Sequence, residues 1–322
     1  MSQPENHIDK LQRRAKRKYV GYPVVKHLLA LDSPLKPAYL TTLSCSSSIN
    51  TFDGKIISRY CKRTWCAVCS PIRTAVRINN YREQLEGLGD LQLTTLTVKN
   101  VQPDQIRNTI QLFRKVFRRY RHAYKKREGK VFRGVYNFEC TYNQRTGLYH
   151  PHIHIIHECI PMDDKDANNH SGKSEDPEFF NDLCQYWVYA CPDTSMKAQD
   201  TRICYDLIEG FKYQSLSVFK IKINGKKQPF IPVKELDIIY QQIKGLRCFQ
   251  AFGINKIPEA DEEKQMDELA AYETSKPDGV YRWAVHDWFL KDREDIALSD
   301  YIPSNKHSKY QTKLLKNEFY QT

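Results

Sequence analysis

The sequence has no long hydrophobic run, and its 322 residues have a mean hydropathy of −0.65. A membrane-spanning helix needs about 20 consecutive apolar residues, so none is expected. The N-terminal stretch is basic, and no apolar segment with a cleavage site follows it, which argues against a secretory signal peptide. We therefore expect a cytoplasmic protein rather than a membrane or secreted one.

Negative charge is also in short supply. The chain has 38 acidic residues against 50 Lys and Arg, which gives a net charge of +12 and a pI near 9.1. Such an excess indicates a polyanionic partner, most often a nucleic acid. Hydrophobic residues make up 40% of the chain, enough for the core of one large domain or two modest ones.

The ten cysteines are not expected to form a disulfide framework, because no secretion signal accompanies them. Cys45, Cys61, Cys66 and Cys69 include a C-x-x-C pair and lie close together in the sequence, a pattern typical of structural zinc sites. Buried free thiols are the alternative interpretation. We interpret the other six cysteines as core thiols.

Composition divides the chain into four segments. Residues 1–40 are a basic N-terminal arm, interpreted either as a solvated, partly disordered segment or as a phosphate-contacting one. Residues 41–90 form the Cys-rich segment, and residues 91–256 form a central domain, which the family resemblance described below implies is catalytic. Residues 257–322 are a C-terminal extension whose role the sequence does not indicate.

The predicted catalytic domain is α+β with a mostly antiparallel sheet. Residues 91–98 are apolar and β-branched, which predicts a buried strand. The turn-rich segment NQRTG separates residues 133–142 from residues 149–157, which predicts a hairpin. A further strand is predicted at residues 247–252.

A long helix is predicted from Pro103 to about Arg127, with apolar residues at helical spacing. Its other faces are strongly basic, and we interpret them as a phosphate-tracking surface, with an ordinary solvated face as the alternative. The predicted DNA-binding residues are Arg114, Lys115, Arg118, Arg119, Arg121, Lys125 and Lys126.

Three histidines alternate along the second strand of the hairpin. Alternate residues of a strand share a face, so His150, His152 and His154 point one way and His157 the other. Several imidazoles that converge on one spot most often bind a metal.

The hairpin supplies a carboxylate for the same site. If the turn is centred in the NQRTG segment, Glu139 faces His152 and lies on the same side of the sheet. We therefore predict Glu139, His152 and His154 as metal ligands, with His150 as a fourth ligand or an outer partner. Two imidazoles and a carboxylate with open positions suit Mn²⁺ or Mg²⁺, and Zn²⁺ also fits.

Tyr205, Glu209 and Tyr213 stand four residues apart and would share one stripe of a helix, beside Lys212. Their ordinary interpretation is as helix-core residues. Next to a cation-bound phosphodiester, however, a deprotonated phenol is a plausible nucleophile. A carboxylate one turn away could remove a proton from water or from a phenol.

Taken together, three motifs resemble the plasmid rolling-circle replication initiators of the HUH (His-hydrophobic-His) endonuclease superfamily. They are LTTLTVKN at residues 93–100, YHPHIHII at 149–156 and EGFKY at 209–213, in the family's order. Residues 44–69 and 246–253 match more loosely.

The resemblance implies a five-stranded antiparallel sheet with the histidine pair on a central strand. It implies that Tyr213 attacks a phosphodiester of single-stranded or cruciform origin DNA, leaving a 3′-hydroxyl primer and a 5′-phosphotyrosine. Glu209 would activate water at termination, and a host helicase or polymerase would then be a partner. The family often has a lysine three or four residues after the tyrosine, where this chain has Leu216 and Ser217. Tyr205 leaves a two-tyrosine variant open.

Three other functions compete with this one. A single-strand transposase of the same superfamily would show the same motifs. A metal hydrolase with an H-x-H pair would need more chain and more ligands after the motif than are present. A non-enzymatic, zinc-dependent DNA-binding protein would explain the charge and the cysteines but not the histidine strand.

Overall fold

The computed structural model describes residues 7–52, 55–159, 182–191, 193–207, 211, 232–268 and 277–308. The chain divides into two compact units. The first unit comprises residues 1–76, 215–237 and 259–322, and the second comprises residues 77–214 and 238–258. Among the helices described, none is long and apolar enough to cross a membrane. The segment boundaries expected from composition remain a prediction.

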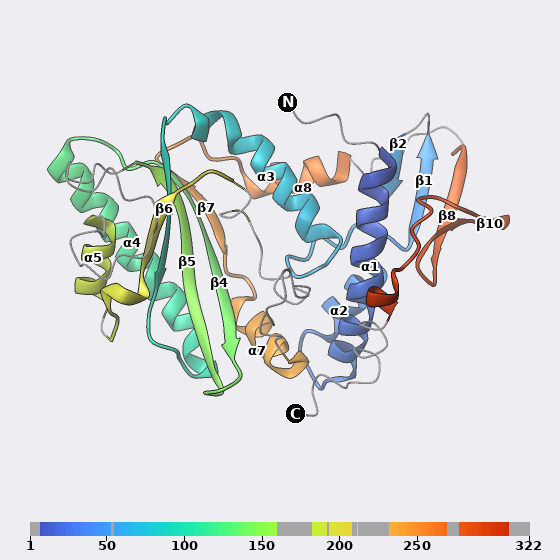
Figure 1. Cartoon of the computed structure of the whole chain (residues 1–322), viewed down its shortest axis with the longest axis horizontal. Coiled ribbons are helices and arrows are strands. Elements are labelled where there is room, and N and C mark those ends of the chain that lie inside the picture. Colours follow the sequence, from blue (N-terminus) through green and yellow to red (C-terminus); the bar gives the residue numbers. More distant parts are fainter. Residues whose placement is uncertain are drawn as a thin grey trace. The chain divides into compact units, whose positions relative to one another are not determined.

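The second unit is built on a five-stranded sheet. Its strands are β3 (Leu91–Thr97), β4 (Gly134–Asn143), β5 (Leu148–Glu158), β6 (Asp200–Ile203) and β7 (Phe249–Phe252), in the order β6-β3-β5-β4-β7. Every neighbouring pair is antiparallel, and β5 is the central strand (Figure 1). The predicted α+β class and the antiparallel five-stranded sheet are thus confirmed.

The β4–β5 hairpin has the predicted register. Glu139 lies opposite His152, and Asn137 lies opposite His154. The turn is set locally: the Asn143 side chain accepts a hydrogen bond from the backbone of Arg145 at 3.0 Å, and Gly147 adopts a φ of 69°. A slip of one residue would move Glu139 to the other face of the sheet, so this turn decides the site.

One face of this sheet is covered by α4 (Ile106–Glu128), which follows a short 3-10 turn at Pro103–Gln105, and by α5 (Asp182–Ala190) (Figure 1). Helix α4 presents an aromatic stripe to the sheet and to α5. Phe113 packs against Trp187 of α5 with ring centroids 4.9 Å apart, and Phe117 packs against Phe252 of β7 at 5.0 Å. Each such buried side chain stabilises the fold by roughly 1.5–3 kcal/mol.

Part of the other face is covered by a hydrophobic core. Ile78, Tyr81 and Leu85, from the second half of α3 (Cys69–Glu86), form a core with strand residues. The strand residues in this core are Leu91, Leu93, Val135, Ile156, Phe249 and Ala251. The same face also carries the buried polar side chains of Glu139 and His152.

The first unit contains a second five-stranded antiparallel sheet, which the sequence did not indicate. Its order is β10-β9-β8-β1-β2, with β8 as the central strand and β1 paired to β8. The strands are β1 (Ser48–Phe52), β2 (Lys55–Ser58), β8 (Gly279–Ala284), β9 (Asp287–Leu290) and β10 (Arg293–Ala297). The C-terminal extension therefore completes a sheet begun near the N-terminus.

Helices α1 (His7–Ala30), α2 (Lys36–Leu43) and α8 (Glu259–Glu268) belong to the first unit, and α7 (Val233–Ile243) spans the division between the units. The interpretation of the N-terminal arm as a disordered segment is wrong for residues 7–30. Helix α1 buries Leu11, Ala15 and Tyr19 against Trp288, because these residues recur at helical spacing.

Candidate metal centres and active site

Glu139, His152 and His154 form one compact group. One ligand atom from each lies within 4.8 Å of the others. Glu139 Oε2 is 3.1 Å from His152 Nε2 and 3.3 Å from His154 Nε2. The three side chains converge because β5 alternates its faces and the hairpin register places Glu139 across from His152.

The electrostatics of this group favour a bound cation. Burial alone would raise the pKa of Glu139, but hydrogen bonds from His152 and His154 outweigh it and hold the pKa well below its usual value. The carboxylate is therefore ionised although its side chain is only 10% exposed. A buried anion needs positive charge beside it, and a divalent cation held by two nitrogens and one oxygen would supply it.

His150 lies beside the group and not in it. Its Nδ1 is 2.9 Å from Asn100 Oδ1, and its Nε2 is 3.1 Å from Thr97 Oγ1. Burial, with a smaller contribution from the charge of His152, lowers the pKa of His150 to about 4. Its backbone oxygen accepts a hydrogen bond from His152 Nδ1 at 3.1 Å. This geometry favours a role for His150 as a hydrogen-bonding partner of the ligand His152, and not as a fourth ligand.

His157 lies on the opposite face of β5, as predicted. It is fully buried, with Nε2 2.8 Å from Thr94 Oγ1 and Nδ1 2.7 Å from the oxygen of Glu158. Burial lowers its pKa to about 4. This histidine is a satisfied core residue and not a ligand.

The predicted nucleophile motif lies mostly outside the described residues. Tyr213, Glu209 and Lys212 are among the residues that are not described. Tyr205 is described and is 86% exposed. The structure therefore does not test the assignment of these four residues, which remains a prediction.

Phe211, in the middle of that motif, is described and buried. Its ring centroid is 5.3 Å from that of Phe249, and its ring stacks on Tyr81 at 6.5 Å. Phe249 pairs with Asn137 across β7 and β4, and Asn137 pairs with His154 across β4 and β5. Paired residues share a face of the sheet. Phe211 therefore packs on the face that carries Glu139, His152 and His154, which we call the metal-type group.

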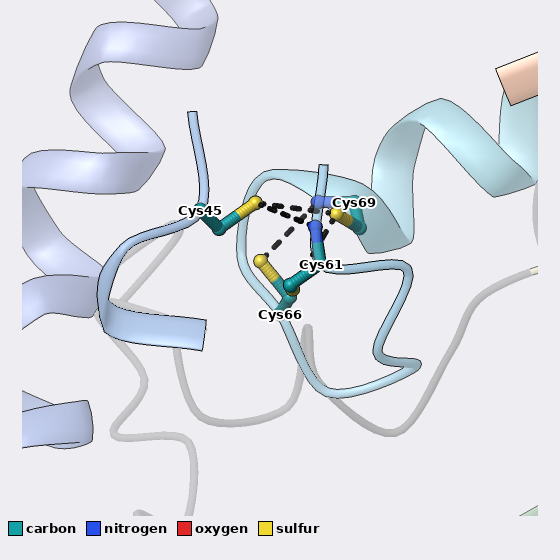
Figure 2. A group of neighbouring side chains, drawn as sticks. All are labelled: Cys45, Cys61, Cys66 and Cys69. Carbon is teal, nitrogen blue, oxygen red and sulfur yellow. Dashed lines mark hydrogen bonds between the residues drawn. The ribbon is translucent and has the colours of Figure 1, made fainter. Parts of the chain in front are cut away.

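The four N-terminal cysteines converge in the first unit (Figure 2). Cys69 Sγ lies 3.4 Å from Cys45 Sγ and 3.7 Å from Cys61 Sγ, and the backbone nitrogen of Cys69 donates to Cys66 Sγ. Zinc bound to four thiolates at about 2.3 Å places its sulfurs about 3.8 Å apart. No disulfide joins any of the ten cysteines, so this cluster is not a pair of disulfides. The residues fit a structural zinc site.

Comparisons with known proteins find similarity over one segment, which contains most of the cysteine cluster and the β4–β5 hairpin. Residues 56–159 match the model of a family described as "Replication protein". That segment contains three of the four cysteines, strand β3, helix α4 and the whole β4–β5 hairpin. This segment of the chain is similar to replication proteins.

A curated relative gives the same result. "Protein rep" of Staphylococcus aureus is 32% identical over 103 residues, which cover 30% of this chain and 44% of the relative. The chain thus spans less than half the length of this replication protein. No solved structure gives a significant match.

Only some of the basic residues of α4 that are predicted to bind DNA are exposed. Arg114 and Arg121 are half-buried, with their guanidinium groups over the rings of Phe138 and Phe252, each at 5.5 Å. The exposed members of the predicted set are Lys115, Arg118, Arg119, Lys125 and Lys126. Because α4 covers the face opposite Glu139, these cations do not face the metal-type group, and their contact with DNA remains a prediction.

Sequence reasoning missed Lys18, which is buried beside the cysteine cluster. Its Nζ donates to the backbone oxygen of Cys45 at 2.5 Å, and its side chain is 7% exposed. Burial lowers the pKa of this lysine, while the cysteines nearby act to raise it. A metal held by four thiolates carries a net negative charge, which this ammonium would offset. Its place in a basic run gave no signal of burial.

Proposed function

We propose that the chain initiates replication by nicking one strand of origin DNA, as a rolling-circle initiator of the HUH type. The observation that supports this most is the convergence of Glu139, His152 and His154 within a segment similar to replication proteins. Its two histidines stand on the central strand of a five-stranded antiparallel sheet, as the resemblance implies, and Glu139 stands on the neighbouring strand.

Glu139, His152 and His154 would hold a divalent cation, Mn²⁺ or Mg²⁺. Such a cation supplies Lewis-acid polarisation of a phosphoryl oxygen and orients the phosphodiester. The three side chains come from two adjacent strands, so they are pre-positioned for this role without movement of a loop.

Tyr213 would act as the nucleophile. Its phenol oxygen forms a bond to phosphorus and loses its proton to solvent or to a nearby base. The bond between phosphorus and the 3′ oxygen breaks, and that oxygen takes up a proton. The products are a 5′-phosphotyrosine and a free 3′-hydroxyl, which serves as primer for a host polymerase.

Glu209 would accept a proton from water, or from a second attacking group, at termination. The anchoring of Phe211 on the face that carries His154 supports a location of the motif near the metal-type group. The four-cysteine cluster would hold a structural zinc ion in the first unit. We further propose that the protein acts in the cytoplasm, where its plasmid would replicate.

The test is to trap the covalent adduct. The full-length protein is incubated with Mn²⁺ and single-stranded fragments of its own replicon, and the linked peptide is identified by mass spectrometry. We expect DNA on the Tyr213 peptide, loss of the adduct in Tyr213→Phe, and retention in the matched control Tyr205→Phe.

A link to Tyr205 would reassign the nucleophile. DNA binding without an adduct on any fragment would overturn nicking and favour a non-enzymatic, zinc-dependent DNA-binding protein. Activity on element ends and not on an origin would identify a single-strand transposase.

A further inference from the structure

The polar residues of β3 and the turn after it face the histidines of β5. Thr95 pairs with His154 across the two strands, and Thr97 pairs with His152. Thr95 Oγ1 lies 2.9 Å from His154 Nδ1, Thr97 Oγ1 lies 3.1 Å from His150 Nε2, and Asn100 Oδ1 lies 2.9 Å from His150 Nδ1. Two of the three histidines therefore have a side-chain partner from the segment 93–100.

A histidine that binds a metal through Nε2 carries its remaining proton on Nδ1. That proton needs an acceptor, and the acceptor also fixes the angle of the ring. For His152 the acceptor is the backbone oxygen of His150. For His154 it is a hydroxyl, which can accept from Nδ1 when a cation is bound and donate to Nδ1 when none is bound.

We propose that Thr95 is the positioning residue of His154, and that the segment 93–100 forms the outer shell of the metal site. Thr95 holds the ring so that Nε2 points at Glu139. This inference rests on the proposed metal-binding role of Glu139, His152 and His154.

Thr97 and Asn100 act one step further away. They engage both ring nitrogens of His150, and so hold that residue in place while its backbone oxygen accepts from His152. These contacts explain why threonines occupy the alternate positions 95 and 97 of this strand. Thr95 and Thr97 face the ligands, while Leu96 is fully buried on the other face.

The test compares three variants of the full-length protein, with the cysteine cluster first saturated with zinc. Thr95→Val removes the hydroxyl and keeps the shape, and Thr95→Ser keeps the hydroxyl. The matched control Thr94→Val removes another hydroxyl bonded to an imidazole, that of His157, on the opposite face of the same strand.

Mn²⁺ affinity is measured without DNA, from the electron paramagnetic resonance signal of the free ion. We expect Thr95→Val to weaken binding roughly 10- to 100-fold, the usual effect of losing an outer partner. Thr95→Ser should restore affinity to within about threefold of wild type, and Thr94→Val should leave it unchanged. Rescue by serine separates positioning of the ring from a general loss of structure.

Equal Mn²⁺ affinity in wild type and Thr95→Val would overturn the inference, as would equal weakening in Thr95→Val and Thr95→Ser. Neither result would touch the nicking proposal. A normal affinity pattern with no DNA adduct would instead overturn nicking and leave the role of Thr95 intact. Absence of a Mn²⁺ site that depends on Glu139 would overturn the metal role on which this inference rests.

Discussion

The two metal-type groups of this chain differ in their donors and in their surroundings. The group in the first unit has four sulfur donors, three of them from buried residues. The group in the second unit has two nitrogens and one carboxylate oxygen, and the His154 side chain is 22% exposed. Four protein ligands close the coordination of a metal, whereas three leave positions for a substrate. The difference supports the proposed structural role of the first group and the proposed chemical role of the second.

The groups also differ in how the chain assembles them. Cys45 follows α2, Cys61 follows β2, and Cys69 begins α3, so the cluster ties together segments before and after the β1–β2 hairpin. Glu139 and His152 belong to one hairpin, whose two strands pair with each other from Gly134 to Asn143 through the backbone. Loss of metal should therefore unfold the surroundings of the first group and leave those of the second intact.

The largest expected effect is from the cysteine cluster. Cys66→Ser should remove the bound zinc and cost several kcal/mol in the stability of the first unit, because binding of a structural zinc is itself folding free energy. Zinc content and thermal unfolding measure this. Cys159→Ser, at an exposed cysteine outside the cluster, should keep one zinc ion per chain. Full zinc content in Cys66→Ser would refute the structural assignment.

A second effect concerns the contribution of His157 to the pH dependence of stability. This residue lies on the face of β5 opposite the ligands. Its pKa falls from 6.5 to about 4 on burial, so the unfolded state binds the proton more readily. The stability that neutral His157 contributes is fully present above pH 6.5 and is lost as pH falls from 6.5 towards 4. It amounts to about 3 kcal/mol, at about 1.4 kcal/mol for each pKa unit.

His157→Gln should flatten the fall in unfolding free energy over that interval, and urea unfolding at pH 7 and pH 4.5 would measure it. The same slope in wild type and variant would mean that His157 is protonated inside the fold. In that case the two faces of β5 would not divide into a structural face and a ligand face.

Glu139 gives a third, smaller effect. Glu139→Gln keeps the shape and removes the negative charge, so Mn²⁺ affinity should fall at least about 100-fold, more than for loss of an outer partner. The melting temperature should stay close to that of the wild type, because the hairpin does not depend on the ion. Calorimetric titration and thermal unfolding separate the two, with Glu128→Gln, on an exposed part of α4, as the control. A collapse of the fold in Glu139→Gln would make this second group structural as well.

The second group was predictable from the sequence because its geometry is local. Alternation along one strand and a turn of known composition place Glu139 opposite His152. The second sheet was not predictable, since β1 is five residues long and its partner β8 lies near the other end of the chain. Helix α1 was not predicted for a different reason. Its sequence is dominated by basic residues, so the apolar stripe that includes Leu11 and Ala15 was not recognised.

The smallest expected effect is from substitution of Lys18. It tests whether a buried cation stabilises the negatively charged cysteine cluster of the first unit. Lys18→Met keeps the length of the side chain and removes its charge and its hydrogen bond to Cys45. Zinc affinity should fall roughly tenfold, about 1.4 kcal/mol, because the negative charge of the metal-bound cluster then lacks the neighbouring ammonium group of Lys18. Competition with a chromogenic chelator measures this. Lys16→Met removes the same charge from an exposed position of α1 and should have little effect, so equal losses in both variants would reduce Lys18 to a general electrostatic contribution.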